Sequence, residues 1–127
     1  QLDSIYRHPR NTTIERRHYE SVVEGMRAAA TGGTCRMLSV MVPDLEACGK
    51  TGTAQNRGHD HSVFMGFAPI RKPKIVYVEN GGWGATYGVP IGALMMEQYM
   101  KGKLSPENEL RAEEISNRII LYGNEER

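Results

Sequence analysis

The sequence lacks the features that mark several large classes of protein. Its 16 lysines and arginines nearly balance its 15 acidic residues, so the net charge of +1 does not favour nucleic acid or an acidic membrane surface as a partner. No apolar run approaches the roughly 18–20 residues of a membrane-spanning helix, and no signal peptide is visible. Repeats and low-complexity stretches are also missing. The remaining composition, 39% hydrophobic and 24% charged, indicates one ordinary globular domain.

Cysteine is scarce as well, because Cys35 and Cys48 are the only two in the chain. Their spacing fits neither a zinc site nor a C-x-x-C redox pair, so we predict no metal and no cofactor. Cys48 has apolar neighbours, which favours a small buried thiol. A disulfide between the two cysteines in an oxidising compartment is the alternative.

Hydrophobic periodicity predicts three helices. The first spans about residues 15–30, where apolar side chains recur at spacings of three and four and end before Gly32. A second helix runs from Val89 to about Met100, with its inward face formed by Ile91, Leu94, Met95 and Tyr99. A third, highly charged helix begins with Ser105 as its N-cap. Residues 34–43 are predicted to be a loop with some extended character.

Three short strands are predicted between the first two helices, over residues 45–54, 62–68 and 74–79. The turns that separate them are too short for β-α-β crossovers, so the strands are expected to be antiparallel. The predicted fold class is α+β, with an antiparallel sheet of about three strands flanked by helices. One edge and one face of such a sheet would have little to cover them, which favours contact with polypeptide outside this chain.

The strongest local signal is the run Gly49-Lys50-Thr51-Gly52-Thr53. A phosphate-binding loop would end in Gly-Lys-Thr, but its required first glycine falls on Asp44, whose carboxylate would repel phosphate. The segment that follows is another strand and not a helix, which also argues against a phosphate-binding loop.

The run also fits the Lys-Thr-Gly box of serine acyl-transferases that react with β-lactams. Lys50 would hold a substrate carboxylate and lower the pKa of neighbouring groups, and the hydroxyls of Thr51 and Thr53 would bind the same carboxylate. Gly52 would let substrate lie against the backbone, and the Thr53 amide would face a developing oxyanion. A surface lysine in a hairpin strand is the plain alternative for the triplet alone.

The residues on either side of this run make the Lys-Thr-Gly box interpretation far more specific. Ordered motifs occur at residues 22–27, 32–34, 49–55, 61–69, 76–82 and 88–92. Together they strongly resemble the transpeptidase domain of class B penicillin-binding proteins of the penicillin-binding protein 2 (elongation) type. The C-terminal ending of the chain resembles the extensions of Bacteroides-like members. The resemblance covers residues 15–102, which leaves 1–14 as an irregular lead-in and 103–127 as a charged helical C-terminal extension. The strand at 74–79 is a few apolar residues shorter than is usual in that family.

The resemblance implies a peptidoglycan D,D-transpeptidase, in which a serine of an S-x-x-K motif attacks a D-Ala-D-Ala bond and forms an acyl-enzyme. None of the six serines here has lysine at the third following position or asparagine at the second. Lys50 carries over as a catalytic residue, and Thr51, Gly52 and Thr53 carry over as substrate-binding residues. The chain alone is therefore predicted to be inactive. Since it begins at Gln1 and not at Met, we expect it to be a piece of a longer protein.

The implied partners follow from the same resemblance. They are peptidoglycan stem peptides ending in D-Ala-D-Ala, β-lactam antibiotics, and the missing N-terminal part of the same protein, with a rod-shape glycosyltransferase as a further candidate. The implied location is the periplasmic face of the bacterial inner membrane, with the anchor outside this segment. The alternatives are a β-lactam-sensing binding domain without turnover and a structural partner that has lost the chemistry.

Two further side chains have more than one interpretation. His61 follows His59 and Asp60. It could order a turn, contact the substrate cleft or bind a metal. Metal binding is the least favoured of the three, because two histidines are too few ligands for a site. Trp83 lies in a glycine-rich loop, where it is predicted to anchor the loop, with sugar binding as the alternative.

Overall fold

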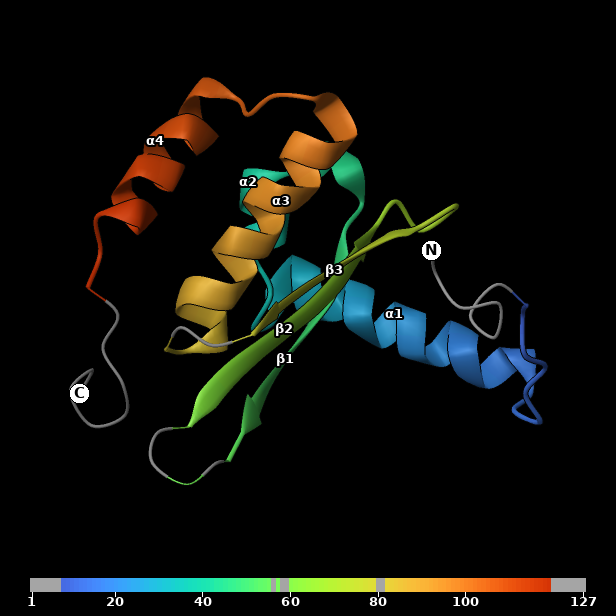
Figure 1. The fold of residues 1–127 in the computed structure, drawn as a ribbon. Helices are drawn as coiled ribbons and strands as arrows, with labels where there is room; N and C mark the ends of the chain where they lie inside the picture. The colour runs from blue at the N-terminus through green and yellow to red at the C-terminus, as the bar shows by residue number, and fades with distance from the viewer. Residues whose placement is uncertain (1–7, 56, 58–59, 80–81, 120–127) are drawn as a thin grey trace.

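Three strands and four helices make up the part of the chain that the computed structural model describes, namely residues 8–55, 57, 60–79 and 82–119 (Figure 1). In chain order the elements are α1 (Arg16–Gly32), α2 (Met37–Met41), the 3-10 turn η2 (Pro43–Leu45), β1 (Cys48–Ala54), β2 (His61–Ala68), β3 (Lys74–Glu79), the π-helical turn η3 (Gly84–Gly88), α3 (Val89–Lys101) and α4 (Pro106–Ser116).

The strands form one antiparallel sheet in the order β1-β2-β3, which confirms the predicted α+β fold class. Lys50 pairs with Met65 and Thr51 with Phe64 in the β1–β2 ladder, and Phe64 pairs with Val78 in the β2–β3 ladder. Within the described residues, β1 and β3 are therefore the two edge strands. The short connections require this arrangement, because only antiparallel neighbours can be joined by a tight turn.

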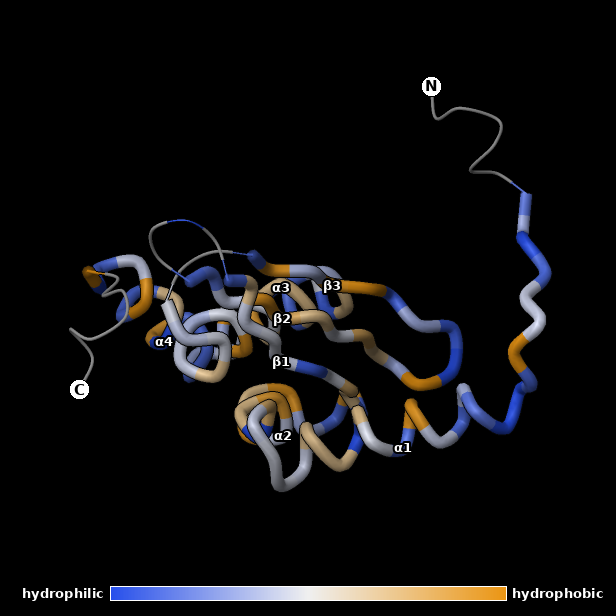
Figure 2. Tube along the Cα trace, turned by 90° about the horizontal axis from the view of Figure 1, so that it is seen from below, coloured by the Kyte–Doolittle hydropathy of each residue, from blue (hydrophilic) through white to orange (hydrophobic). Residues whose placement is uncertain are grey.

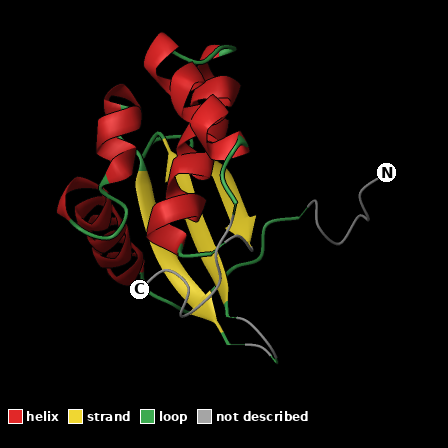
Figure 3. Cartoon of the chain, turned by 90° about the vertical axis from the view of Figure 1, so that its left-hand side faces the viewer, coloured by secondary structure: helices red, strands yellow, loops and turns green. Residues whose placement is uncertain are grey.

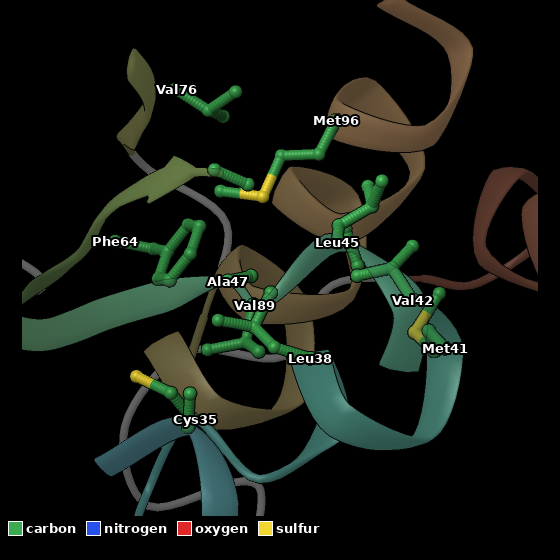
Figure 4. Packing of buried hydrophobic residues seen from close by; sticks show 13 residues of the cluster. Cys35, Leu38, Met41, Val42, Leu45, Ala47, Phe64, Val76, Val89 and Met96 are labelled. Atoms are coloured by element: carbon green, nitrogen blue, oxygen red, sulfur yellow. The ribbon is translucent and has the colours of Figure 1, made fainter. Parts of the chain in front are cut away.

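The core lies between one face of the sheet and helices α2 and α3. Phe64 projects from β2 onto that face and is fully buried, surrounded by Cys35, Leu38, Val89 and Met96 (Figure 4). A Cβ added at Gly92 of α3 would run into the Phe64 ring. This glycine therefore lets α3 approach the strands closely, and Figure 3 shows the helix crossing them.

The opposite face of the sheet is largely open. Met65, Ile75 and Tyr77 alternate with the core residues and remain 48%, 75% and 50% exposed. Figure 2 shows α1 running along the β1 side of the sheet, and α1 contacts that strand. This agrees with the expectation of a sheet face with little to cover it.

Residues 34–43 were expected to be a loop, and that prediction is wrong for α2. Leu38, Met41, Val42 and Leu45 are buried at helical spacings of three and four, continuing from α2 into η2. This short apolar stripe is buried against the core and α3. The burial stabilises α2, which is too short to form by helix propensity alone.

The predicted inward face of α3 is also partly wrong. Met95 and Tyr99 are 47% and 69% exposed, whereas Val89, Ala93 and Met96 are the buried apolar side chains. The helix is rotated so that its small residues, Gly92 and Ala93, meet the Phe64 side of the sheet, which larger residues would not allow.

Candidate active site

The four residues of the Lys-Thr-Gly-Thr run all lie on edge strand β1. Lys50, Gly52 and Thr53 are exposed and Thr51 is half-buried. A phosphate-binding loop would place the Gly-Lys-Thr end of its motif at the start of a helix, whereas these residues lie inside an extended strand. The strand conformation therefore argues further against nucleotide binding.

The start of β1 is fixed by close packing at Gly49. A Cβ at this position would meet the Phe64 ring, the Leu38 Cδ1 atom at 3.0 Å and the Cys35 Sγ atom at 3.3 Å. Because side chains alternate along a strand, this buried glycine sets the side of the sheet from which Lys50 projects. Lys50 therefore emerges on the open face, opposite to the core.

Lys50 has few partners for its charge. Its Nζ atom donates to the carbonyl oxygen of Thr51, the next residue along the strand. Among the described residues, the ion pairs involve other cations, and no carboxylate lies within ion-pair distance of Lys50. The ammonium is thus exposed and able to bind an anionic group from outside.

Thr51 is held by the turn that follows α1. Its Oγ1 atom lies 2.9 Å from the Oγ1 atom of Thr34, seventeen positions earlier in the chain. Sequence reasoning noted Thr34 only as part of a motif, and the signal that would have found it was the adjacent glycine pair, Gly32 and Gly33.

Thr53 lies two residues beyond Thr51 on the same edge strand and pairs with Ser62 of β2. Its backbone amide is the group that the Lys-Thr-Gly interpretation assigns to a developing oxyanion.

Neither cysteine forms a disulfide, since both thiols are free and buried. The prediction of a small buried thiol is confirmed for Cys48, and the disulfide alternative is wrong. Burial raises the pKa of the Cys35 thiol, although Thr34, Lys50 and the Thr51 amide oppose this shift. Burial likewise raises the pKa of Cys48, so both side chains are neutral thiols near pH 7.

His61 is half-buried at the start of β2, paired with Ala54 at the far end of β1. Alternation places it on the same sheet face as Lys50, roughly 13 Å further along the strand. His59 lies outside the described residues. Within the described ranges, no group of three histidine, cysteine or acidic side chains is arranged to hold a metal ion.

The turn at Trp83 is anchored by its main chain. The Trp83 carbonyl accepts hydrogen bonds from the amides of Thr86 and Tyr87 at 3.0 and 2.9 Å. The Tyr87 side chain is buried, whereas the Trp83 indole is 47% exposed. The turn brings Gly84 against the Thr51 side chain, so this segment forms one wall beside the candidate site.

None of the helices in the described ranges combines the length and the hydropathy that crossing a membrane requires.

Comparisons with known proteins point to one family. The family described as "Penicillin binding protein transpeptidase domain" matches residues 5–101 of this chain. The peptidoglycan D,D-transpeptidase MrdA of Haemophilus influenzae is 28% identical over 81 residues. That alignment covers 61% of this chain but only 12% of the relative. No solved structure matches the chain.

Proposed function

The chain belongs to the penicillin-binding protein transpeptidase domain family, and from this premise we propose that it is the Lys-Thr-Gly segment of a peptidoglycan D,D-transpeptidase. The matched relative is several times longer than the aligned stretch, so the proposal concerns a larger protein to which these residues contribute one wall of the active site.

The observation that carries the proposal is the exposed ammonium of Lys50 on an edge strand, which has no ion-pair partner among the described residues. We assign Lys50 to the substrate carboxylate and to the protonation state of the nucleophile. Thr51 and Thr53 contribute hydroxyl donors, Gly52 leaves room for substrate along the strand, and the Thr53 amide stabilises the oxyanion. His61 lies on the same face, in reach of an extended peptide that follows β1.

The nucleophile is proposed to come from outside these 127 residues, because no serine here is followed by lysine at the third position. Its hydroxyl oxygen would attack the D-Ala-D-Ala carbonyl, release the terminal D-alanine and form a serine ester. An amine of a neighbouring stem peptide would then attack the ester and regain the free serine. A β-lactam would acylate the same serine by opening its ring.

The proposed setting follows from the family and from the relative's peptidoglycan chemistry. Peptidoglycan lies outside the cytoplasmic membrane, so we propose the periplasmic face of the inner membrane, with the anchor in polypeptide beyond this chain. Stem peptides, β-lactams and the remainder of the same protein are the proposed partners, and a rod-shape glycosyltransferase is a further one.

Covalent labelling of the longer protein with a fluorescent penicillin tests the proposal. Wild type is expected to label, and Lys50→Ala is expected to lower the second-order labelling rate constant by roughly 100-fold or more, because a preorganised charge at the reacting group is lost. Lys74→Ala, another exposed lysine of the sheet, is the matched control and should label like wild type.

Two results would count against the assignment. Normal labelling of Lys50→Ala would remove the proposed role of the lysine, and absence of labelling in wild type would remove the family chemistry altogether. A protein that labels but does not crosslink stem peptides would instead be a β-lactam sensor.

A further inference from the structure

Two neighbours fix the position of the Thr51 side chain. Its hydroxyl lies 2.9 Å from that of Thr34, and its methyl side faces Gly84, where an added Cβ would sit 3.4 Å from both Cβ and Cγ2 of Thr51. The side chain is thus held between the turn after α1 and the turn before α3, in one orientation beside the free edge of β1.

The position of Thr34 is itself closely defined. Gly33 packs against the last turn of α1. The backbone amides of Gly33 and Cys35 both donate hydrogen bonds to the Ala29 carbonyl, each at 3.1 Å. A Cβ at Gly33 would lie only 2.9 Å from the Ala29 Cα atom, so another residue would push the turn away from the helix. The glycine therefore delivers Thr34 to the edge of β1.

The hydrogen bond between the Thr34 and Thr51 hydroxyls uses only one of their two hydrogens. Each threonine has a single O–H, and one of the two donates to the other across 2.9 Å. When Thr34 donates, the Thr51 oxygen accepts and its own hydrogen is free for a ligand. Lys50 Nζ bonds to the carbonyl of the same Thr51, so the cation and the free hydroxyl hydrogen belong to one short stretch of edge strand.

We propose that Thr34 is a positioning residue that, by donating to Thr51, aims the Thr51 hydroxyl at the carboxylate of the stem peptide or β-lactam. The inference rests on the proposed transpeptidase function and adds a residue outside the Lys-Thr-Gly run to its site. Thr34 acts through Thr51, so the inference predicts an effect specific to the ligand's carboxylate and not a general loss of activity.

The test uses the longer protein and compares a penicillin with its methyl ester, which lacks the negative charge. Acylation by each is followed by competition with a fluorescent penicillin. Thr34→Val removes the hydroxyl while keeping the side-chain shape, and it is expected to lower the acylation rate constant for the free acid roughly tenfold. For the ester, the change is expected to stay within about twofold, since no carboxylate is present to be positioned.

Two variants serve as matched comparisons. Thr34→Ser keeps the hydroxyl and is expected to restore the rate for the free acid to within about threefold of wild type. Thr31→Val carries the same substitution in the last turn of α1, where the threonine bonds to α1 carbonyls, and it should leave both rates unchanged. Thr34→Ala is a second hydroxyl-free variant and has to give the same acid-to-ester ratio as Thr34→Val.

Equal losses on acid and ester, or a free-acid rate for Thr34→Val within about twofold of wild type, would overturn the role of Thr34 while leaving the proposed function standing. A wild-type protein that is never acylated by either compound would overturn both.

Discussion

Lys50 and Glu97 are both charged, but the chain surrounds them in opposite ways. Lys50 is exposed on an edge strand, and within the described part of the chain its ammonium bonds only to the carbonyl beside it. Glu97, in α3, is 2% exposed and accepts hydrogen bonds from Asn108 Nδ2 at 2.6 Å, the Ser105 amide at 3.2 Å and Lys101 Nζ at 3.4 Å. A charge with every partner supplied internally holds the structure together, whereas one left unpaired at the surface is available to a ligand.

The partners of Glu97 form a junction between α3, α4 and the α2–η2 segment. The fully buried Asn108 also donates to the Met41 carbonyl at 2.8 Å and accepts from Arg111 at 2.9 Å. Lys101 reaches Asp44 at 2.9 Å, which links the end of α3 to η2. Burial alone would raise the pKa of Glu97, but the hydrogen bonds from Asn108, Ser105 and Lys101 outweigh it and lower the pKa.

The largest effect on stability is expected when Glu97 is removed. Glu97→Ala leaves the Asn108 side-chain amide and the Ser105 amide without their buried acceptor, and the free energy of unfolding should fall by about 3–5 kcal/mol. Urea unfolding of the 127-residue chain measures this change. Glu113→Ala, on an exposed position of α4, is the matched control and should change stability by less than about 0.5 kcal/mol. A loss below about 1 kcal/mol for Glu97→Ala would mean that the junction does not hold α4 in place.

A smaller effect is expected from acid, and its sign follows from the lowered pKa of Glu97. The ionised carboxylate stabilises the folded chain at pH values above its unfolded pKa of about 4.3, and this contribution is lost as pH falls through the lower folded pKa. Asp44, whose pKa the hydrogen bond from Lys101 also lowers, contributes a loss in the same direction. The comparison is therefore between wild type and Glu97→Gln, since both retain Asp44.

The stability advantage of wild type over Glu97→Gln is expected to be full near pH 7 and to shrink as pH falls below about 4.3. Unfolding free energies measured from pH 7 down to pH 3 test this. An advantage that stays constant over that range would contradict an ionised Glu97 in the folded chain. The pKa of Lys101 is raised, chiefly by its hydrogen bond to Asp44. The stability that the charged Lys101 contributes is therefore lost only at high pH, as pH rises above about 10.4.

The smallest effect on stability is expected at the candidate site. Lys50→Ala removes an exposed side chain that has no ion-pair partner among the described residues, so the unfolding free energy should change by less than about 0.5 kcal/mol. The same urea titration measures it. A loss above about 1 kcal/mol would make Lys50 a structural residue and remove its contrast with Glu97.

Local chemistry predicted much of the fold. The third strand has the predicted bounds, Lys74–Glu79, and the second begins one residue before the prediction, at His61. Ser105 caps α4 as expected, with its Oγ atom accepting from the Asn108 amide at 3.4 Å. These features depend on alternation, turn residues and capping, which are properties of neighbouring residues along the chain.

Features that depend on distant contacts were not predicted. Asn108 and Met41 are 67 positions apart, and no local pattern marks Asn108 as buried, because it lies in a highly charged helix. The contact between Thr34 and Thr51 escaped prediction for the same reason, as did the rotation of α3 toward Phe64. The candidate site was found because its motif is contiguous, whereas the residue that positions Thr51 comes from another segment.

Mapping the acylated residue tests the central claim most directly. The longer protein would be labelled with penicillin, digested, and analysed by mass spectrometry to locate the modified peptide. We predict one adduct, on a serine outside these 127 residues, which forms roughly 100-fold or more slowly in Lys50→Ala. An adduct on any residue of this chain would contradict the claim that β1 supplies the Lys-Thr-Gly wall of a site whose nucleophile comes from elsewhere.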